Sequence, residues 1–200
     1  MIAVINYGLG NLHSVQKAIS YVGGDAKVTA DPDTILQADK VVLPGVGAFA
    51  EGMKGLESHA LTSLIKQIAA AGRPILGICL GMQLLFETSE EQGAHSGLGV
   101  IPGKVKGFRD PDLKIPQIGW NQLDLRDQSS LLAGFEHGSY VYFNHSYYCS
   151  PIDPAHVLAT TTYGVQFAAA VQKDNIFGVQ FHPEKSQRIG LKIIRNFVEL

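Results

Sequence analysis

The sequence predicts an α/β protein whose open, mainly parallel sheet is flanked by helices and continued by an antiparallel β extension. In the first half, short apolar segments alternate with amphipathic helical segments, the pattern of buried parallel strands joined by helices. In the second half, strand-like segments follow one another with only turns between them. The 200-residue chain contains no internal repeat, linker or low-complexity tract, so we expect one domain over residues 1–200.

The first half supplies four strand candidates and the helices between them. The strands are expected at residues 2–6, 26–29, 40–43 and 75–79. A turn at residues 8–11 and a helix to about Tyr21 follow the first strand, and Pro44-Gly45 stops the third. One amphipathic helix is expected next, with Met53, Leu56, Ala60, Leu61, Leu64, Ile65 and Ile68 on one face. Gly72 stands where that helix would be capped, and a further helical segment runs through residues 84–86.

The second half is predicted to be mainly antiparallel. Its strand-like segments lie near residues 104–108, 122–125, 139–145, 156–162, 166–172 and 175–181. Little helix is expected before residues 187–199. Short turns join antiparallel neighbours directly, so these strands would extend the parallel core without crossover helices.

Charge and cysteine content exclude several classes of function. The net charge is -2 and Lys and Arg form no block, so neither nucleic acid nor a membrane surface is expected as a partner. No apolar run approaches the ~20 residues of a spanning helix, and no signal peptide is visible. Cys79 and Cys149 are too few for a disulfide framework, which favours a cytoplasmic protein with free thiols. No His or Cys pair has zinc-ligand spacing, and we expect no metal or other cofactor.

The segment Gly77-Ile78-Cys79-Leu80-Gly81 matches a G-x-S-x-G nucleophile elbow with cysteine in place of serine. A sharp strand-to-helix turn would strain Cys79, and the flanking glycines would allow close backbone approach. The N-terminus of the following helix would favour the reactive thiolate, and the Leu80 N–H would serve as an oxyanion donor. The alternative is a buried structural cysteine, which the strand before and the helix after it disfavour.

A nucleophilic cysteine needs a base within hydrogen-bond reach and a group that orients this base. Of the seven histidines, His182 has the best setting, because it closes an apolar strand and precedes Pro183-Glu184. Proline disfavours helix, so we expect an extended segment in which side chains 182 and 184 project to one side. Glu184 would then reach His182, although a surface histidine at a strand end is the alternative. Cys79, His182 and Glu184 are the predicted catalytic residues of a cysteine-nucleophile amide hydrolase.

At this point the motifs resemble a known family, the class I glutamine amidotransferases. The resemblance rests on residues 77–85 (GICLGMQLL) and on Phe181-His182-Pro183-Glu184. Within that class, three further segments are similar to the glutaminase subunits of imidazole glycerol phosphate synthase: Asn6-Tyr7-Gly8-Leu9-Gly10-Asn11, Pro44-Gly45-Val46-Gly47 and Pro116-Gln117-Ile118-Gly119-Trp120-Asn121. The resemblance extends from residue 2 to about 195.

The resemblance implies a reaction, a partner and a set of site residues. Glutamine would be hydrolysed to glutamate and ammonia through a thioester on Cys79. The ammonia would pass to a TIM-barrel cyclase subunit in a heterodimer, which forms imidazole glycerol phosphate and AICAR in histidine biosynthesis. An N–H near Val46 or Gly47 would complete the oxyanion hole beside Leu80. Residues implied to hold glutamine are Gln83, Glu91, His145, Ser146 and Tyr147; those implied to face the partner are Asn11, Trp120 and Lys185.

Glycines on both sides of Val46 also predict regulation. Positive φ values are accessible to glycine, so a peptide in this segment could flip at low energy. A flipped-out N–H would leave the oxyanion hole with one donor. We therefore expect the isolated chain to be a poor glutaminase that its partner activates.

Two alternative functions compete with this one. Gly8-Leu9-Gly10, with Asp31 about twenty residues later, imitates a dinucleotide-binding fingerprint, but His13 occupies the place of its third glycine. The closer alternative is the glutaminase partner of anthranilate synthase or of pyridoxal phosphate synthase. Gly119-Trp120-Asn121 and Lys185-Ser186 argue against both. Trp120 could also be a plain core residue and Lys185 a solvated charge.

Overall fold

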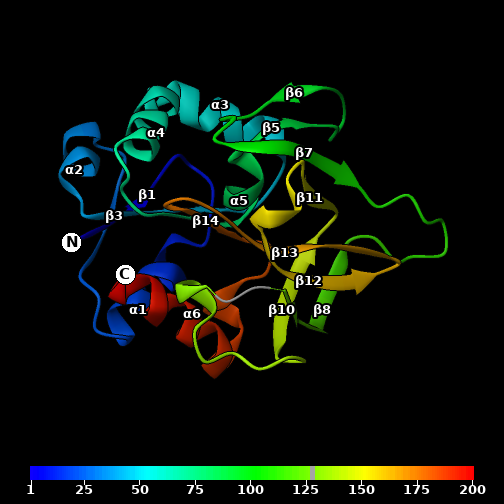
Figure 1. Cartoon of the computed structure of the whole chain (residues 1–200). Coiled ribbons are helices and arrows are strands. Elements are labelled where there is room, and N and C mark those ends of the chain that lie inside the picture. Colours follow the sequence, from blue (N-terminus) through cyan, green and yellow to red (C-terminus); the bar gives the residue numbers. More distant parts are fainter. Residues whose placement is uncertain (127–128) are drawn as a thin grey trace.

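A computed structural model of the chain describes residues 1–126 and 129–200, and its centre is a sheet with helices on both faces (Figure 1). The strand order of this sheet is β2-β1-β3-β4-β14-β13-β12-β9. Its strands are β1 Ile2–Ile5, β2 Ala26–Thr29, β3 Lys40–Gly45, β4 Ile75–Cys79, β9 Asp124–Leu125, β12 Val157–Tyr163, β13 Val165–Lys173 and β14 Ile176–Val179. Neighbours from β2 to β14 are parallel, and β13, β12 and β9 add antiparallel strands. The predicted fold class is confirmed.

Helices cover the sheet on both sides, as the apolar strand β1 predicts. They are α1 Leu12–Tyr21, α2 Pro32–Gln37, α3 Phe49–Ser58, α4 Leu61–Ala70, α5 Leu80–Leu84 and α6 Gln187–Glu199. Ala3 and Ile5 of β1 lie in one apolar cluster with α3 and α4, whereas Ile2 and Val4 lie in another with α1 and α6. Side chains alternate across a strand, so a strand covered on both faces must be apolar at every position. No helix among the described residues is long and apolar enough to cross a membrane.

Two smaller sheets stand beside the main one. One pairs β8 (Gln117–Gln122) with β10 (Tyr140–His145) in antiparallel fashion. The other has the order β11-β7-β5-β6, with β5 Phe86–Ser89, β6 His95–Ser96, β7 Ile101–Gly107 and β11 Tyr147–Pro151. Short 3-10 helices lie at Ser130–Leu132 (η1), Pro154–His156 (η2) and Pro183–Lys185 (η3). Figure 1 shows β8 and β10 beside β12, at the end of the molecule away from α2.

The single amphipathic helix predicted over residues 53–68 is wrong, because two helices meet there. α3 ends before His59, and Ala60 adopts a left-handed conformation with φ 56° ahead of α4. The side chains of Ser58 and His59 both contact the Gly55 carbonyl, where they compete with continued helix. Ala60 is exposed instead of lying on the apolar face. The predicted cap at Gly72 is confirmed by its φ of +74°.

Other local predictions need correction. The helix expected through residues 84–86 ends at Leu84, and Phe86 begins β5. The strands β5, β6 and β11, most of β8, and helix α2 were not predicted. β14 is antiparallel to β13 but parallel to β4, with Gly178 opposite Gly77. The segment 175–181 therefore belongs to the parallel core as well as to the antiparallel extension, and this decides where His182 lies.

Candidate active site

The carboxyl ends of β3, β4 and β14 meet at one edge of the sheet. Gly45 lies opposite Cys79, and Val179 lies opposite Ile78. Cys79 ends β4 and His182 follows β14 by three residues, so neighbouring parallel strands bring them to the same edge. A cavity of about 210 Å³ is lined by both residues. This is the edge at which open α/β sheets bind their ligands.

Cys79 has the backbone of a strained strand-to-helix turn. Its φ is 54° and its ψ is -111°, a combination that residues with a Cβ seldom adopt. A Cβ on Gly77 would lie 2.7 Å from the Met82 nitrogen, and one on Gly81 would collide with the Leu43 carbonyl oxygen. The two flanking glycines are thus required for this turn. α5 is only five residues long, so its dipole contributes less than a full helix would.

His182 and Glu184 form a buried pair beside Cys79. The Nδ1 atom of His182 lies 2.9 Å from Oε1 of Glu184, and the two side chains are 2% and 1% exposed. Burial alone would lower the pKa of His182, but interactions with the Cys79 sulfur and the Glu184 carboxylate outweigh it and raise this pKa to about 9. Among the described residues, the other Glu184 oxygen has no hydrogen-bond partner. Within the part of the chain that the structure describes, the hydrogen bond of this carboxylate therefore goes to the imidazole.

The extended segment predicted at Pro183 is wrong, because residues 183–185 form the 3-10 helix η3. Proline is accepted at the first position of a helix, where its missing N–H would have no partner. The tight turn still brings Glu184 to His182. Ser186, which is buried, then fixes the backbone: its Oγ donates to the His182 carbonyl at 2.6 Å and accepts from Tyr142 N at 2.9 Å. This support from Ser186 was not predicted from the sequence.

The segment after β3 forms another wall of the cavity. Val46 and Gly47 line the cavity together with Leu80, and Gly47 has a φ of +104°. Before them, the carbonyl of Pro44 accepts a 2.7 Å hydrogen bond from the buried Tyr7 hydroxyl. Burial, together with the nearby Cys79, raises the pKa of Tyr7, so this hydroxyl stays protonated. The Pro44–Gly45 peptide is therefore anchored through its carbonyl oxygen, whereas Val46 and Gly47 follow beyond this hydrogen bond.

The five residues implied to hold glutamine all line the same cavity: Gln83, Glu91, His145, Ser146 and Tyr147. Gln83 uses both N–H groups of its amide, donating to the Tyr147 carbonyl at 2.9 Å and to Oε1 of Gln180 at 3.1 Å. Glu91 accepts from the Phe49 N–H at 2.7 Å, at the start of α3. Burial lowers the pKa of His145 to about 4, so this histidine is neutral. Pro116 and Asn144 also line the cavity, and Asn144 had not been singled out.

The three residues implied to face a partner lie outside the cavity. Trp120 is 45% exposed, which excludes a plain core role. Its ring packs edge-on against that of Tyr142, with the ring centres 6.1 Å apart. The ammonium of Lys185 lies 5.8 Å from the centre of the same Tyr142 ring. Asn11 is the N-cap residue of α1, a helix that packs beside η3. Trp120 and Lys185 are thus brought together on Tyr142, whereas Asn11 is on a neighbouring element.

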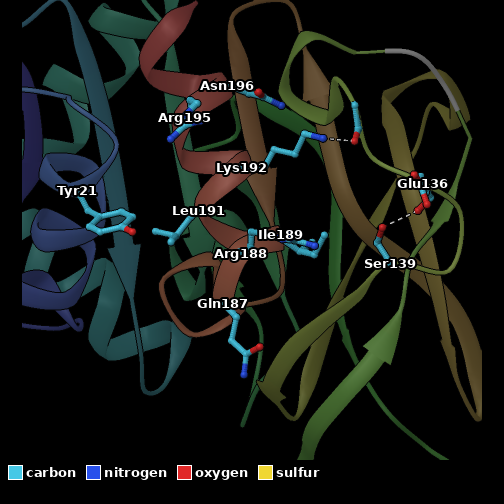
Figure 2. Close-up of a pocket in the computed structure, with 11 residues that line it drawn as sticks. Tyr21, Glu136, Ser139, Gln187, Arg188, Ile189, Leu191, Lys192, Arg195 and Asn196 are labelled. Atoms are coloured by element: carbon cyan, nitrogen blue, oxygen red, sulfur yellow. Dashed lines mark hydrogen bonds between the residues drawn. The ribbon is translucent and has the colours of Figure 1, made fainter.

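A larger hollow, of about 820 Å³, lies between α6 and the loop over residues 134–139 (Figure 2). Arg188, Lys192 and Arg195 project from α6 around it, and Lys192 donates to the Gly134 carbonyl. Its lining residues include neither cysteine nor histidine. Size alone therefore does not select the reactive site. In the described residues, no three His, Cys, Asp or Glu side chains are grouped to hold a metal ion.

Known proteins match the chain over nearly its whole length. Residues 3–200 match the family model described as glutamine amidotransferase class-I. The imidazole glycerol phosphate synthase subunit HisH of Geobacter metallireducens is 52% identical over 202 residues, covering 98% of this chain and 96% of the relative. The subunit of the same name from Chlorobium luteolum is 48% identical, with both chains fully covered.

Solved structures share the fold at low sequence identity. A structure of PurLQS from Thermotoga maritima has a TM-score of 0.78 at 19% identity, covering 99% of this chain and 97% of that one. A crystal structure described as a glutamine amidotransferase has a TM-score of 0.78 at 16% identity, covering 100% and 98%. At these sequence identities, the structural similarity shows the fold alone.

Proposed function

The chain belongs to the class I glutamine amidotransferase family, and within it to the HisH subunits of imidazole glycerol phosphate synthase, and we propose that Cys79, His182 and Glu184 carry out its glutamine hydrolysis. Its reaction yields glutamate and ammonia for histidine biosynthesis. The observation that carries the assignment of residues is the buried His182–Glu184 pair beside an elbow cysteine. The glutaminases of anthranilate synthase and pyridoxal phosphate synthase are not favoured by these full-length relatives.

In the proposed mechanism, the Cys79 sulfur attacks the amide carbon of glutamine while its proton resides on His182. The Leu80 N–H, with a second donor near Val46 or Gly47, stabilises the oxyanion. The C–N bond then breaks, and the His182 imidazolium gives its proton to the departing ammonia, leaving a thioester on Cys79. Neutral His182 next takes a proton from water, which attacks the thioester and releases glutamate.

Charge and hydrogen bonding support the proposed glutamine site. The Glu91 carboxylate lines the cavity and suits the α-ammonium group of an amino acid. Both N–H groups of the Gln83 amide are already used, so this side chain offers its carbonyl oxygen to the substrate. His145 is neutral because burial lowers its pKa to about 4, so it adds no positive charge that would repel the ammonium. Ser146 and Tyr147 complete this wall.

For the partner, we propose a TIM-barrel cyclase that docks on the exposed face of β8 and β10, with Asn11 and Lys185 at its border. Ile118 is 60% exposed, Trp120 45% and Tyr140 53%, so large apolar side chains face solvent on this small sheet. Such a patch is typical of a protein–protein interface. Lys185 follows the proposed base His182 by three residues, so docking here lies next to the site of ammonia release. Both cysteines are free, which suits the proposed cytoplasmic location.

Covalent labelling tests the proposed nucleophile. A diazo-ketone norleucine analogue, which mimics glutamine, is expected to label Cys79 and to be excluded by excess glutamine. Cys149 is 1% exposed, and burial raises the pKa of its thiol, so it should stay unmodified. Peptide mass spectrometry locates the adduct, with Cys79→Ala as the control. An adduct on Cys149, or labelling that glutamine does not slow, would refute the assignment.

A second prediction concerns pH. The pKa of His182 is raised to about 9, so its proton-donating imidazolium is present below that pH and is lost above it. The kcat/KM for glutamine should therefore fall as the pH rises through about 9. Glu184→Gln keeps the volume but removes a charge that raises this pKa, so the alkaline limb should move to lower pH and kcat should drop by about 10- to 100-fold. An unmoved alkaline limb in the variant would show that Glu184 does not stabilise the imidazolium.

A further inference from the structure

Gln180 is a polar residue whose neighbours in the chain are apolar. It lies between the end of β14 and His182 and is fully buried, with 0% exposure. Its backbone N–H donates to the Ala169 carbonyl at 2.9 Å, which fixes it against β13. Its neighbours Val179 and Phe181 belong to an apolar cluster. Burying an amide in such surroundings is unfavourable unless each of its polar atoms finds a partner.

Both ends of the Gln180 amide have partners. Its Oε1 accepts from Nε2 of Gln83 at 3.1 Å, and its Nε2 lies 3.8 Å from the Cys79 sulfur, within hydrogen-bond range for sulfur. The same Nε2 of Gln83 also donates to the Tyr147 carbonyl at 2.9 Å. A chain of hydrogen bonds thus runs from the glutamine-site wall through two side-chain amides to the sulfur.

The direction of this chain follows from its end point. Amide oxygen and nitrogen are hard to tell apart by shape, so their orientation must be argued from partners. The Tyr147 carbonyl can only accept, so Gln83 must turn its NH2 group toward it. The second N–H of that group then requires an acceptor, which is Oε1 of Gln180. The NH2 group of Gln180 is therefore the end that faces Cys79.

The sulfur has a contrasting contact on another side. It donates to the Asn144 carbonyl at a distance of 3.8 Å. A carbonyl oxygen can hold the protonated thiol but repels a thiolate, whereas an N–H group stabilises the thiolate. The two contacts thus favour opposite protonation states of Cys79. When the proton leaves the sulfur, the Gln180 N–H remains as a favourable contact.

We propose that Gln180 is a positioning residue for the nucleophile: its amide N–H holds the Cys79 sulfur in place and stabilises the thiolate, in an orientation that Gln83 fixes. This inference rests on the proposed role of Cys79 in glutamine hydrolysis. The alternative is a purely structural role, in which the contacts of Gln180 only satisfy the hydrogen-bonding groups of its buried amide. The two differ in one respect, because a merely structural residue would not change how the reactivity of Cys79 depends on pH.

The test measures the rate at which iodoacetamide alkylates Cys79 at pH values between 5 and 10. Peptide mass spectrometry monitors the alkylation. Gln180→Met keeps the length of the side chain and leaves a weak acceptor for Gln83, but it removes the N–H donor. We expect the rate at pH 7 to fall roughly tenfold and the midpoint of the pH profile to rise by about one pH unit, with full reactivity recovered at high pH. Circular dichroism and thermal unfolding check that the variant is folded.

Gln172→Met is the matched control. Gln172 also uses both ends of its amide, accepting from Ser129 at 2.6 Å and donating to the Asp174 carbonyl at 3.1 Å. Neither partner lines the cavity that contains Cys79. This variant should leave the alkylation profile unchanged. Gln180→Glu provides a second substitution if methionine prevents folding. It places an acceptor where the donor was, so alkylation at pH 7 should fall further than in Gln180→Met.

The outcomes separate this inference from the proposed function. An unshifted alkylation profile in folded Gln180→Met would overturn the role of Gln180, even if the chain hydrolyses glutamine. A shifted profile supports it, whether or not glutamine proves to be the substrate. Hydrolysis is measured separately, as ammonia released from glutamine by the unmodified chain with its partner.

Discussion

Replacing His182 by alanine is expected to lower glutamine hydrolysis almost as far as replacing Cys79 by alanine, by about 10⁴- to 10⁶-fold in kcat. The reason is that neither residue acts alone. Without the imidazole, the proposed mechanism loses the group that takes up the thiol proton and returns it to ammonia. Steady-state release of ammonia, with the cyclase partner present, measures the loss.

The same argument predicts the behaviour of the double variant. If the two residues act as a unit, combining Cys79→Ala with His182→Ala should lower kcat little beyond either single change. His137→Ala is a suitable control, because His137 is also paired with a carboxylate, Asp124 at 3.3 Å, but is 69% exposed. It should retain full activity. Losses of the two single variants that multiply in the double variant would mean that His182 acts independently of Cys79.

The sequence could predict these two residues because each stands in a short, self-contained pattern. The turn at Cys79 depends on Gly77 and Gly81, which are its close neighbours in the chain. The backbone conformation predicted after His182 was nevertheless wrong, since Pro183 begins a 3-10 helix instead of continuing the strand. The carboxylate reached its partner through a different backbone path. Residue type and spacing were informative here, whereas the expectation that proline keeps the segment extended was not.

Residues that support the site from a distance could not be predicted in the same way. Tyr7 bonds to Pro44, 37 residues away, and Gln180 contacts Cys79 across 101 residues. Such pairs are set by strand order, and no local pattern encodes them. A signal for Gln180 did exist, because it is the polar residue in the apolar run over residues 176–181. At Ala60, by contrast, the break between α3 and α4 occurs without glycine or proline to announce it.

The isolated chain is expected to hydrolyse glutamine about 10²- to 10³-fold more slowly than the chain with its cyclase and the nucleotide ligand of that cyclase. This factor is the usual loss when one oxyanion donor is missing. It corresponds to about 2.7–4 kcal/mol, at or slightly above the upper end of ordinary coupling between sites. Steady-state ammonia release, measured for the chain alone and then with each component added, tests the expectation. Full activity in the chain alone would refute regulation by the partner.

The structure limits where such a switch can lie. The Pro44 carbonyl is held by Tyr7, and a Cβ on Gly45 would collide with the Tyr7 hydroxyl, so the chain is fixed up to that point. Beyond it, Val46 is 41% exposed and Gly47 has a φ of +104°. We therefore expect the switch to lie in the peptides that flank Val46. Val46 and Gly47 both line the cavity that Cys79 and His182 share.

Gly47→Ala tests this location directly. A Cβ on Gly47 meets no atom within 4 Å, so alanine would clash with nothing, yet its φ of +104° is unfavourable for any residue with a Cβ. The substitution should destabilise the resting conformation of the free chain and raise its basal rate of hydrolysis by up to roughly tenfold. The factor by which the partner increases the rate should then become smaller. Gly23→Ala is the matched control, with a φ of +93°, equal space and a position at the end of α1. If Gly47→Ala lowered basal activity, or if Gly23→Ala raised it equally, the switch would not lie in the Val46–Gly47 peptide.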